Sequence, residues 1–378
     1  MEMKNQSNAN TKPLIVVTGS SGLIGKRLIK TLTSDYRVVG LDIAAPDTND
    51  CSHIECDLTD DESVQQAVRK IEQDHGERIA SVVHLAAYYD FSGEPSPLYD
   101  ELTVEGTKRL LRSVKDSTAD APGAGSLKVE QFIFSSSLLV MKPSEDGHPI
   151  TASSPVEAEW DYPQSKLRAE EVITNEGRGM NTVILRIAGV YDEQCHSIPL
   201  AQQMARIHEK QMESYLFPGD KTNGQSFIHL DDVVDCIQAT IGRRSELAKQ
   251  EVFVIGEEDV MTYEELQESL GELLHGKEWP TIRIPATVAK VGAWAKDKMA
   301  TSEEDSPFIK PWMIDLADQN YPVNIHRARE LLGWAPQHTL RQTLPAMVRC
   351  LQEDPRRWYE INGLPLPDRL SAEETSNS

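Results

Sequence analysis

A glycine-rich turn near the N-terminus constrains the fold of this chain more than any other feature. Leu14 to Val17 is a short apolar, β-branched run, as in a buried strand, and it stops at Thr18-Gly19. A helical pattern of apolar residues opens at once, and its members share one face: Leu23, Ile24, Leu28 and Ile29. A strand, a tight turn and a helix in immediate succession predict the first unit of a parallel α/β sheet.

The three glycines of this turn have the spacing of a dinucleotide-binding turn. Gly19 allows the tight turn, Gly22 lets the backbone approach a ligand, and Gly25 lets the helix pack closely on the strand. Backbone N–H groups at such a helix start form an anion site suited to a pyrophosphate. The residues of the turn expected to bind the cofactor are Gly19, Ser21, Gly22, Leu23, Ile24 and Gly25.

An acidic residue at the end of the next strand indicates which dinucleotide is bound. The strand at residues 36–41 ends in Asp42, which lies 23 residues after Gly19. A carboxylate at this offset binds the ribose 2′-hydroxyl of NAD. It would repel the 2′-phosphate of NADP, and residues 43–45 supply no arginine to receive one. The sequence therefore predicts NAD as the cofactor.

The composition excludes several other classes of protein. The 378 residues carry a net charge of −22, so a nucleic acid or an anionic membrane would repel the chain. Five scattered cysteines show no metal-type spacing, and we expect reduced thiols and no metal site. Residues 1–12 lack the apolar core of a signal peptide, and no stretch approaches the roughly 18 apolar residues of a membrane span. We expect a soluble, cytoplasmic protein that acts on a small molecule.

Predicted strands alternate with helices of ten or more residues, which indicates a doubly wound parallel sheet of the Rossmann type. Its strands end in residues that would gather at one edge: Gly19, Asp42, Asp57, Ala86 and Ser137. We expect an NAD-binding domain over residues 13–190, with a strand returning to it within 226–256. A smaller, helix-rich, substrate-binding portion is expected over 191–370, and disordered tails over 1–12 and 371–378.

A tyrosine and a lysine four residues apart open a predicted helix and share one of its faces. They are Tyr162 and Lys166, and Pro163 is tolerated because it falls in the first turn. A nearby ammonium favours the phenolate of a tyrosine, which can then exchange a proton with a substrate hydroxyl. Ser137, at the end of the preceding strand, can hold the same oxygen. Such a pair alone is usually a surface pair, but the cofactor-type strand order upstream favours a catalytic interpretation.

Several motifs together make the chain recognisable. They are Thr18-Gly-Ser-Ser-Gly-Leu-Ile-Gly25, Asp42, Cys56-Asp57-Leu58, His84-Leu-Ala-Ala87, Ser135-Ser-Ser137, Tyr162-x-x-x-Lys166, Leu185-Arg-Ile-Ala-Gly-Val-Tyr191, Phe227-Ile-His-Leu-Asp-Asp232 and Leu331-Leu-Gly-Trp-Ala-Pro336. Over roughly residues 13–350 the chain resembles the extended short-chain dehydrogenase/reductase family, in its NAD-dependent epimerase/dehydratase branch.

The resemblance implies a serine–tyrosine–lysine site for hydride transfer to and from nicotinamide. Tyr162 would be the acid/base, Lys166 would lower its pKa and hold the nicotinamide ribose, and Ser137 would bind the reacting oxygen. The resemblance also implies that Asp57 and Leu58 flank the adenine. Leu85, Ala86 and Ala87 would line the cofactor cleft. Relatives often form dimers, so a homodimer is a further expectation.

Departures from the family pattern bear on the substrate. Ser137 is followed by Leu138-Leu139 in place of the Asp-Glu pair of dehydratases, which disfavours dehydration. Nucleotide-sugar enzymes commonly carry an arginine before the Phe-Ile-His motif, where this chain has Gly224-Gln225-Ser226. Residues 311–318 also differ from those enzymes and look more like hydroxysteroid dehydrogenase and flavonoid reductase relatives. Arg186 or Arg206 is an alternative source of the missing positive charge.

Three functions remain open on the sequence. The leading one is an NAD-dependent oxidoreductase that interconverts a secondary alcohol and a ketone. The second is a nucleotide-sugar 4-epimerase with tightly bound NAD. The third is an NAD-binding regulatory protein without turnover, against which the intact Ser137, Tyr162 and Lys166 set argues.

Overall fold

The computed structural model describes residues 12–45, 50–90, 93–116, 127–145, 147–177, 179–299, 309–367 and 370. Its main feature is a seven-stranded sheet in the order β12-β8-β7-β5-β1-β2-β3, with every neighbouring pair parallel. Its strands are β1 (Leu14–Thr18), β2 (Arg37–Asp42), β3 (Ser52–Glu55), β5 (Ser81–His84), β7 (Gln131–Ser137), β8 (Asn181–Ile187) and β12 (Gln250–Ile255). The chain runs from β1 out to β3 and then from β5 out to β12, which is the Rossmann arrangement. The predicted fold class is confirmed.

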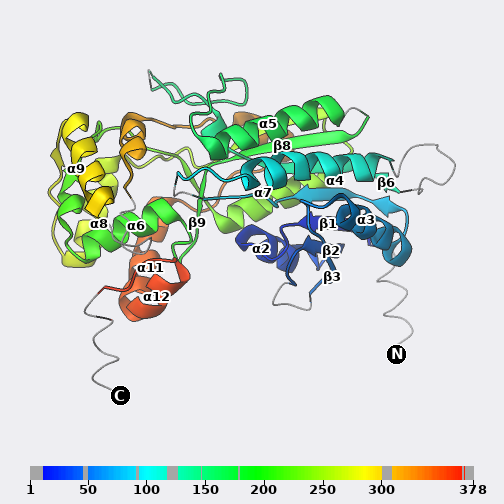
Figure 1. The fold of residues 1–378 in the computed structure, drawn as a ribbon, viewed down its shortest axis with the longest axis horizontal. Helices are drawn as coiled ribbons and strands as arrows, with labels where there is room; N and C mark the ends of the chain where they lie inside the picture. Colours follow the sequence, from blue (N-terminus) through cyan, green and yellow to red (C-terminus); the bar gives the residue numbers. More distant parts are fainter. Residues whose placement is uncertain are drawn as a thin grey trace, which may run out of the picture.

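Helices cover both faces of the sheet (Figure 1). One face carries α2 (Leu23–Leu32), α7 (Leu230–Gly242) and α10 (His326–Leu332), and the other carries α3 (Asp61–His75), α4 (Glu105–Asp116) and α5 (Asp161–Glu176). Side chains of a strand point alternately to the two faces. Ile15 and Val17 of β1 therefore pack in the first core, and Leu14 and Val16 pack in the second. All of β1 is buried, as its continuous apolar run predicts.

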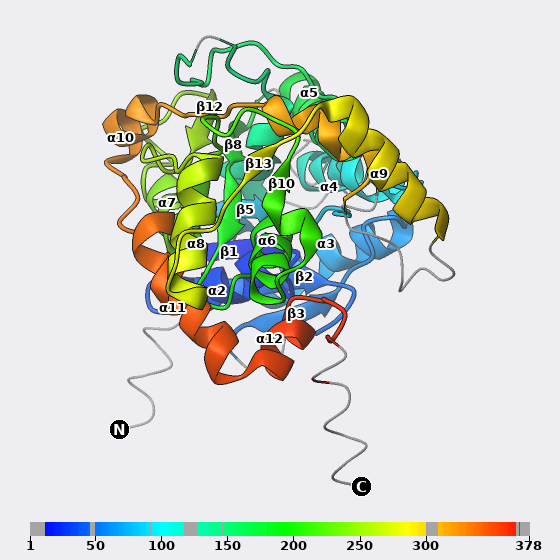
Figure 2. The same cartoon turned by 90° about the vertical axis from the view of Figure 1, so that its left-hand side faces the viewer.

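The C-terminal part is rich in helices and has a core of its own. Its elements are α6 (Ile198–His208), η3 (Met212–Tyr215), α8 (Tyr263–His275), α9 (Ala286–Met299), η4 (Pro311–Asp318), α11 (Leu340–Glu353) and α12 (Pro355–Ile361). Apolar residues of α6, α8, α11 and α12 pack together around Trp279 and Trp358. In Figure 2 these four helices lie in front of the main sheet.

Short elements complete the described chain. Three two-stranded sheets pair β9 (Gly189–Tyr191) with β11 (Phe227–His229), β10 (Leu216–Phe217) with β13 (Ile282–Arg283), and β4 (Arg78–Ile79) with β6 (Lys128–Val129). A π-helix, η1 (Tyr99–Val104), precedes α4, and a 3₁₀ turn, η2 (Leu138–Val140), follows β7.

Some boundaries differ from the sequence prediction. The strand expected to end at Asp57 ends at Glu55, because the Asp57 carboxylate accepts hydrogen bonds from the N–H and hydroxyl of Thr59 and closes a turn. The strand expected to end at Ala86 is β5, which ends at His84 and is preceded by the separate short strand β4. The expected return of a strand to the sheet is observed, since β12 pairs with β8. The division into a 13–190 domain and a 191–370 portion stays a prediction, and residues 1–11 and 371–378 lie outside the described residues.

Candidate active site

The glycine turn between β1 and α2 has the geometry that the sequence predicts. Gly19 has φ +67°, a conformation that side chains disfavour, and a Cβ there would lie 2.8 Å from the backbone nitrogen of Ala86. A Cβ on Gly25 would lie 2.2 Å from the carbonyl oxygen of Gly19, so this position allows the helix to pack against the turn. A Cβ on Gly22 would lie 3.3 Å from the same oxygen. The turn therefore fits the close backbone approach that a pyrophosphate requires.

Asp42 ends β2 beside this turn. Its Oδ2 accepts a hydrogen bond of 2.9 Å from the Ser21 N–H, and its Oδ1 accepts one of 2.8 Å from the Ile43 N–H. The Ser21 hydroxyl donates to the Ala44 carbonyl. Ser21 thus fixes the Asp42 carboxylate at the edge of the turn. The roles of both residues toward the cofactor stay predictions.

The other predicted cofactor residues follow the ends of β3 and β5. Ala86 lies against Gly19, and its N–H faces the Thr18 hydroxyl at 3.3 Å. Leu58 is buried, whereas Asp57 is exposed. His84 joins these elements, because one ring nitrogen meets the Thr18 hydroxyl at 2.6 Å and the other meets the Thr107 hydroxyl of α4 at 2.9 Å. Burial lowers the pKa of His84 to about 3, so its ring is neutral.

Ser137, Tyr162 and Lys166 come together where β7 ends against the first turns of α5. The Tyr162 and Ser137 side chains share a hydrogen bond, and the Ser137 oxygen accepts a bond from the Leu139 N–H. Lys166 is buried, and its Nζ donates to the Ser135 carbonyl at 2.7 Å. The same Nζ lies 5.9 Å from the centre of the Tyr162 ring. The predicted trio is therefore assembled in the folded chain.

The electrostatics of this trio differ from the simple expectation of a depressed tyrosine pKa. Burial raises the pKa of Tyr162 to about 12, although the hydrogen bond with Ser137 acts in the opposite direction. Burial also lowers the pKa of Lys166 to about 7, against the effect of the Glu170 carboxylate. Removal from water is the largest cause of both shifts. The predicted depression of the Tyr162 pKa by Lys166 is not present in this geometry.

A buried ion pair lies one turn beyond Lys166 on the same face of α5. The Glu170 carboxylate accepts bonds from the Arg186 guanidinium of β8, at 2.7 Å from Nη2 and 3.1 Å from Nε. The Ser136 hydroxyl donates to the same carboxylate at 2.5 Å. Arg186 is therefore paired with Glu170. It is one of the two arginines considered as an alternative partner for a pyrophosphate, and its charge is already neutralised by this carboxylate.

Replacing Lys166 with methionine is expected to stabilise the cofactor-free protein below pH 7. Burial holds the folded-state pKa near 7, while a free lysine has a pKa near ~10.4. The unfolded chain therefore binds the proton more tightly than the folded chain does. The buried lysine lowers the free energy of unfolding by its full amount below pH 7, and this effect disappears as the pH rises toward the pKa of a free lysine. Thermal unfolding should show a Tm gain of about 3 °C or more at pH 6 and a smaller one at pH 9. Lys30→Met, an exposed change on α2, should give no such pH-dependent gain; an equal gain from both variants would contradict the argument.

One cavity of about 430 Å³ joins the glycine turn to the serine–tyrosine–lysine trio. The predicted site residues that line it are Gly19, Gly22, Leu23, Ile24, Gly25, Leu85, Ala87, Ser137, Tyr162 and Lys166. The other predicted site residues do not line it: Ser21, Asp42, Asp57, Leu58 and Ala86. Most of the predicted site residues therefore line one cavity.

The cavity also has lining residues that sequence reasoning did not assign to it. They are Tyr89, Leu138, Leu139, Ile187 to Val190, His196 to Pro199, Gln225 to Phe227 and Tyr321. They come from η2, the end of β8, β9, the start of α6, β11 and the segments between these elements. Because these segments lie far apart in the sequence, their convergence had no sequence signal beyond the strand-end rule. Neither Arg186 nor Arg206 lines the cavity. Among the described residues its lining contains no arginine and no carboxylate.

Aromatic rings surround Tyr162 on its outer side. The ring centres of Tyr89 and Trp160 lie 4.9 and 5.6 Å from that of Tyr162. Trp312 of η4 lies 5.2 Å from Trp160. Of these rings, Tyr89 and Tyr162 line the cavity and give its wall flat, largely apolar surfaces.

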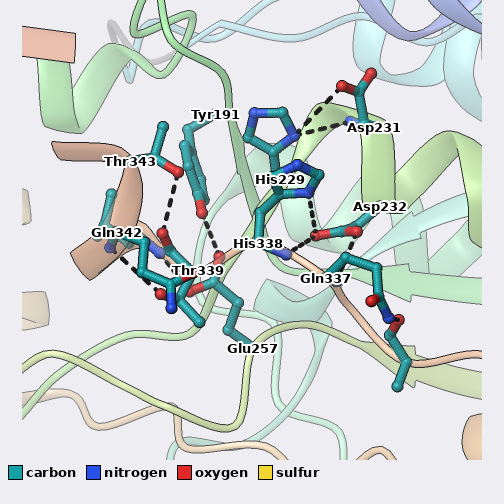
Figure 3. A network of polar contacts seen from close by, with 12 residues as sticks. Tyr191, His229, Asp231, Asp232, Glu257, Gln337, His338, Thr339, Gln342 and Thr343 are labelled. Carbon is teal, nitrogen blue, oxygen red and sulfur yellow. Dashed lines mark hydrogen bonds and ion pairs between the residues drawn. The ribbon is translucent and has the colours of Figure 1, made fainter. Parts of the chain in front are cut away.

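The Phe227-to-Asp232 motif builds a polar network that joins the sheet to the C-terminal helices (Figure 3). His229 accepts a bond from the Asp231 N–H at the start of α7, and its ring stacks on His338 at 4.1 Å. Asp232 accepts bonds from the N–H groups of Gln337 and His338. These contacts give the motif a structural role, because they link the segment that starts α7 to the segment that precedes α11.

The comparisons with known proteins identify the family. The NAD dependent epimerase/dehydratase family matches residues 15–256. A UDP-glucose 4-epimerase of Vibrio cholerae is 27% identical over 339 residues, covering 87% of this chain and 92% of that protein. A decarboxylating sterol-4-alpha-carboxylate 3-dehydrogenase of Candida albicans is 24% identical over 373 residues, covering 90% and 98%. The chain belongs to the NAD-dependent epimerase/dehydratase family and is an enzyme with NAD as its cofactor.

Solved structures support the fold. The UDP-glucose 4-epimerase of Thermotoga maritima, solved with UDP-glucose, superposes with a TM-score of 0.65 at 21% identity, covering 91% of this chain and all of that one. The Thermus thermophilus UDP-glucose 4-epimerase complex with NAD gives 0.65 at 19% identity, covering 90% and 99%. In the described part of the chain, no helix is both long and apolar enough to cross a membrane.

Proposed function

We propose that this enzyme is an oxidoreductase that interconverts a secondary alcohol and a ketone at Ser137, Tyr162 and Lys166. The observation that carries the proposal is the single cavity shared by these side chains and the Gly19–Gly25 turn. A hydride donor or acceptor and a proton donor must both reach one carbon–oxygen group, and this cavity is the place where both are available.

Each residue of the trio has a defined task in this proposal. Bound NAD supplies the hydride acceptor or donor. Tyr162 takes the proton of the substrate hydroxyl, or returns it to the ketone oxygen. Ser137 is a hydrogen-bond partner of Tyr162 and holds the same oxygen. The Lys166 ammonium uses one donor on the Ser135 carbonyl and keeps its others for the ribose beside Tyr162.

The cofactor would be held by residues at the ends of four strands, β1, β2, β3 and β5. The pyrophosphate would be held by the turn residues Gly19, Ser21, Gly22, Leu23, Ile24 and Gly25. Asp42 would bind the adenosine ribose, and Asp57 and Leu58 would flank the adenine. The side of the cofactor cleft would be lined by Leu85, Ala86 and Ala87. The positive φ of Gly19 and the crowding at Gly25 support this arrangement.

The cavity walls favour an apolar substrate over a nucleotide sugar. A nucleotide diphosphate needs nearby positive charge, and no arginine lines the cavity. Arg186 is paired with Glu170, and the Nη1 of Arg206 is buried without a hydrogen-bond partner among the described residues and away from this lining. The sterol dehydrogenase among the relatives acts, by its name, on a sterol carboxylate and not on a nucleotide sugar.

A nucleotide-sugar 4-epimerase is the second candidate, and the relatives favour it. One relative matched over most of its length is named a UDP-glucose 4-epimerase, and another carries out 4-epimerisation of an undecaprenol-linked sugar. Both candidates share the alcohol-to-ketone step and the same trio. They differ in whether the ketone leaves the enzyme or is reduced again.

Mass spectrometry of the gently purified and then denatured protein separates the two candidates. An empty protein that binds added NAD, and that accumulates NADH with a secondary alcohol, would support the oxidoreductase. Stoichiometric release of NAD, with conversion of a nucleotide sugar and no NADH accumulation, would establish the epimerase instead. NAD binding with no turnover of any alcohol, ketone or sugar would leave the regulatory function.

Asp42→Ala is expected to weaken NAD binding about 10- to 100-fold and NADP binding much less. The reason is the loss of charge-assisted hydrogen bonds to the ribose hydroxyls, worth about 1.5–3 kcal/mol. Glu55 ends β3 directly beside Asp42 in the sheet and is exposed, so Glu55→Ala is the matched control and should leave both affinities unchanged. Titration of each variant with NAD and NADP gives the comparison. Equal losses for both dinucleotides would remove Asp42 from the ribose role.

A further inference from the structure

A histidine–aspartate pair stands in the wall of the cavity, and the proposed proton transfer does not use it. The Nδ1 of His196 lies 2.7 Å from the Asp192 Oδ2. His196 lines the cavity, with 25% of its side chain exposed, whereas Asp192 is 9% exposed and does not line it. Asp192 is thus the more buried partner, and it holds the Nδ1 edge of a ring that lines the cavity.

The Asp192 carboxylate also binds the backbone of the loop that carries this pair. Besides the ring contact, its Oδ1 accepts hydrogen bonds from the backbone N–H groups of Gln194, at 3.0 Å, and His196, at 3.1 Å. Cys195, between those two residues, has φ +62° and is fully buried. A non-glycine residue in this conformation is strained by about 1–2 kcal/mol. The strained residue therefore directly precedes His196, which lines the cavity.

Few side chains in the described lining of the cavity can carry a charge, and His196 is one of them. The titratable side chains of the described lining are Tyr89, Tyr162, Lys166, His196 and Tyr321. Lys166 is bound to the Ser135 carbonyl and assigned to the cofactor side. The lining holds neither a carboxylate nor an arginine, so His196 is the remaining group there that can carry a positive charge toward a substrate.

The chemistry of the pair selects the kind of group that it binds. A carboxylate beside Nδ1 accepts the proton of that nitrogen and so orients the ring. When Nε2 also carries a proton, the ring is an imidazolium and offers a charged N–H donor on its other edge. Burial alone would raise the pKa of Asp192, but its bonds from the His196 ring and backbone bring that pKa below its usual range. Asp192 therefore stays ionised beside the ring. A charged donor in a cavity with apolar walls binds an anionic oxygen more strongly than a neutral one.

We propose that His196, oriented by Asp192, binds an oxyanion substituent of the substrate, that is, a carboxylate or a phosphate group. The proposal rests on the proposed function, because it assigns the substrate to this cavity. It narrows the substrate to a molecule with an apolar body and one anionic group. Asp192 is the positioning residue, and His196 is the group that touches the substrate.

Histidine-ring NMR of the NAD-loaded full-length protein tests this proposal. The ring signal of His196 is assigned by its loss in His196→Gln. Sodium propionate and inorganic phosphate serve as separate anion probes, and propionamide serves as the uncharged counterpart of propionate. His326 is the internal control, because it also pairs with a carboxylate, Glu330 at 3.2 Å, on exposed α10 outside the cavity.

The expected result is a saturable movement of the His196 signal with at least one anion and none with propionamide or at His326. Propionate alone would identify a carboxylate, and phosphate alone a phosphate group. Asp192→Asn should weaken the same binding about tenfold or more, because the ring loses its ionic partner. If that variant does not fold, calorimetric titration of His196→Gln with the same anions makes the comparison.

Two outcomes would overturn the proposal: a His196 signal that neither anion moves, or one that propionamide moves equally. Unchanged anion affinity in Asp192→Asn, or in His196→Gln by calorimetry, would also overturn it. The test does not depend on turnover. Tyr162→Phe should retain this anion binding, so failure of the proposed function and failure of the anion site are distinguishable.

Discussion

Tyr162→Phe is expected to lower turnover by about 10²- to 10⁴-fold while the protein remains folded and binds NAD. The hydroxyl is the group that exchanges a proton with the substrate, and general acid–base catalysis contributes a factor of this size. The ring itself would keep its packing against Tyr89 and Trp160. The measurement is the rate of NADH formation or consumption, together with NAD titration and thermal unfolding of both proteins.

Tyr321→Phe is the matched control for this experiment. Tyr321 lines the same cavity, and its hydroxyl bonds to Gln319 at 3.1 Å. Its loss should change turnover by a few-fold at most, since Gln319 lies outside the proposed proton path. A turnover in Tyr162→Phe equal to that of the unaltered protein would rule out the assigned acid/base residue. A collapse of the same size in both variants would point to general disruption of the cavity.

Gly25→Ala is expected to weaken NAD binding at least about 100-fold and to lower the free energy of unfolding by about 2–4 kcal/mol. Its Cβ would lie 2.2 Å from the Gly19 carbonyl oxygen and 2.9 Å from the Ser20 Cα. Both are backbone atoms of the turn, so the turn has to move, and overpacking of this kind is costly. The displaced turn would no longer present its N–H groups to the pyrophosphate. NAD titration and denaturant unfolding measure the two effects.

Gly292→Ala provides the control for helical glycines. Gly292 lies within α9, and a Cβ there meets no atom within 4 Å. It should stabilise the protein slightly, by up to about 1 kcal/mol, and leave NAD binding unchanged. NAD binding by Gly25→Ala at the normal affinity would show that the cofactor does not use this turn.

The cofactor half of the fold was accessible from the sequence because its signals are local. A buried strand, a glycine triplet and an acid at the next strand end lie within residues 14–42, and each has a direct backbone consequence. The same holds for the trio. The strand ending at Ser137 and the spacing of Tyr162 and Lys166 place them together once the sheet is parallel.

The remaining features of the site depend on contacts between distant segments. His196, Gln225 and Tyr321 reach the cavity from three separate loops, and no periodic pattern links them. The pKa of Tyr162 depends on how far folding removes its hydroxyl from water. The four-residue spacing of Tyr162 and Lys166 does not predict this burial. The commitment of Arg186 to Glu170 likewise requires β8 to be placed beside α5.

Transfer of deuterium from labelled NADH tests the central claim most directly. The protein is incubated with NADH deuterated at the transferred position and an extract of small molecules, and the products are analysed by mass spectrometry. The proposed function predicts a product with one deuterium on a carbinol carbon, formed by the unaltered protein and by Tyr321→Phe but not by Tyr162→Phe. Bound NADH with no labelled product, or equal labelling by Tyr162→Phe, would contradict the proposed hydride-transfer site.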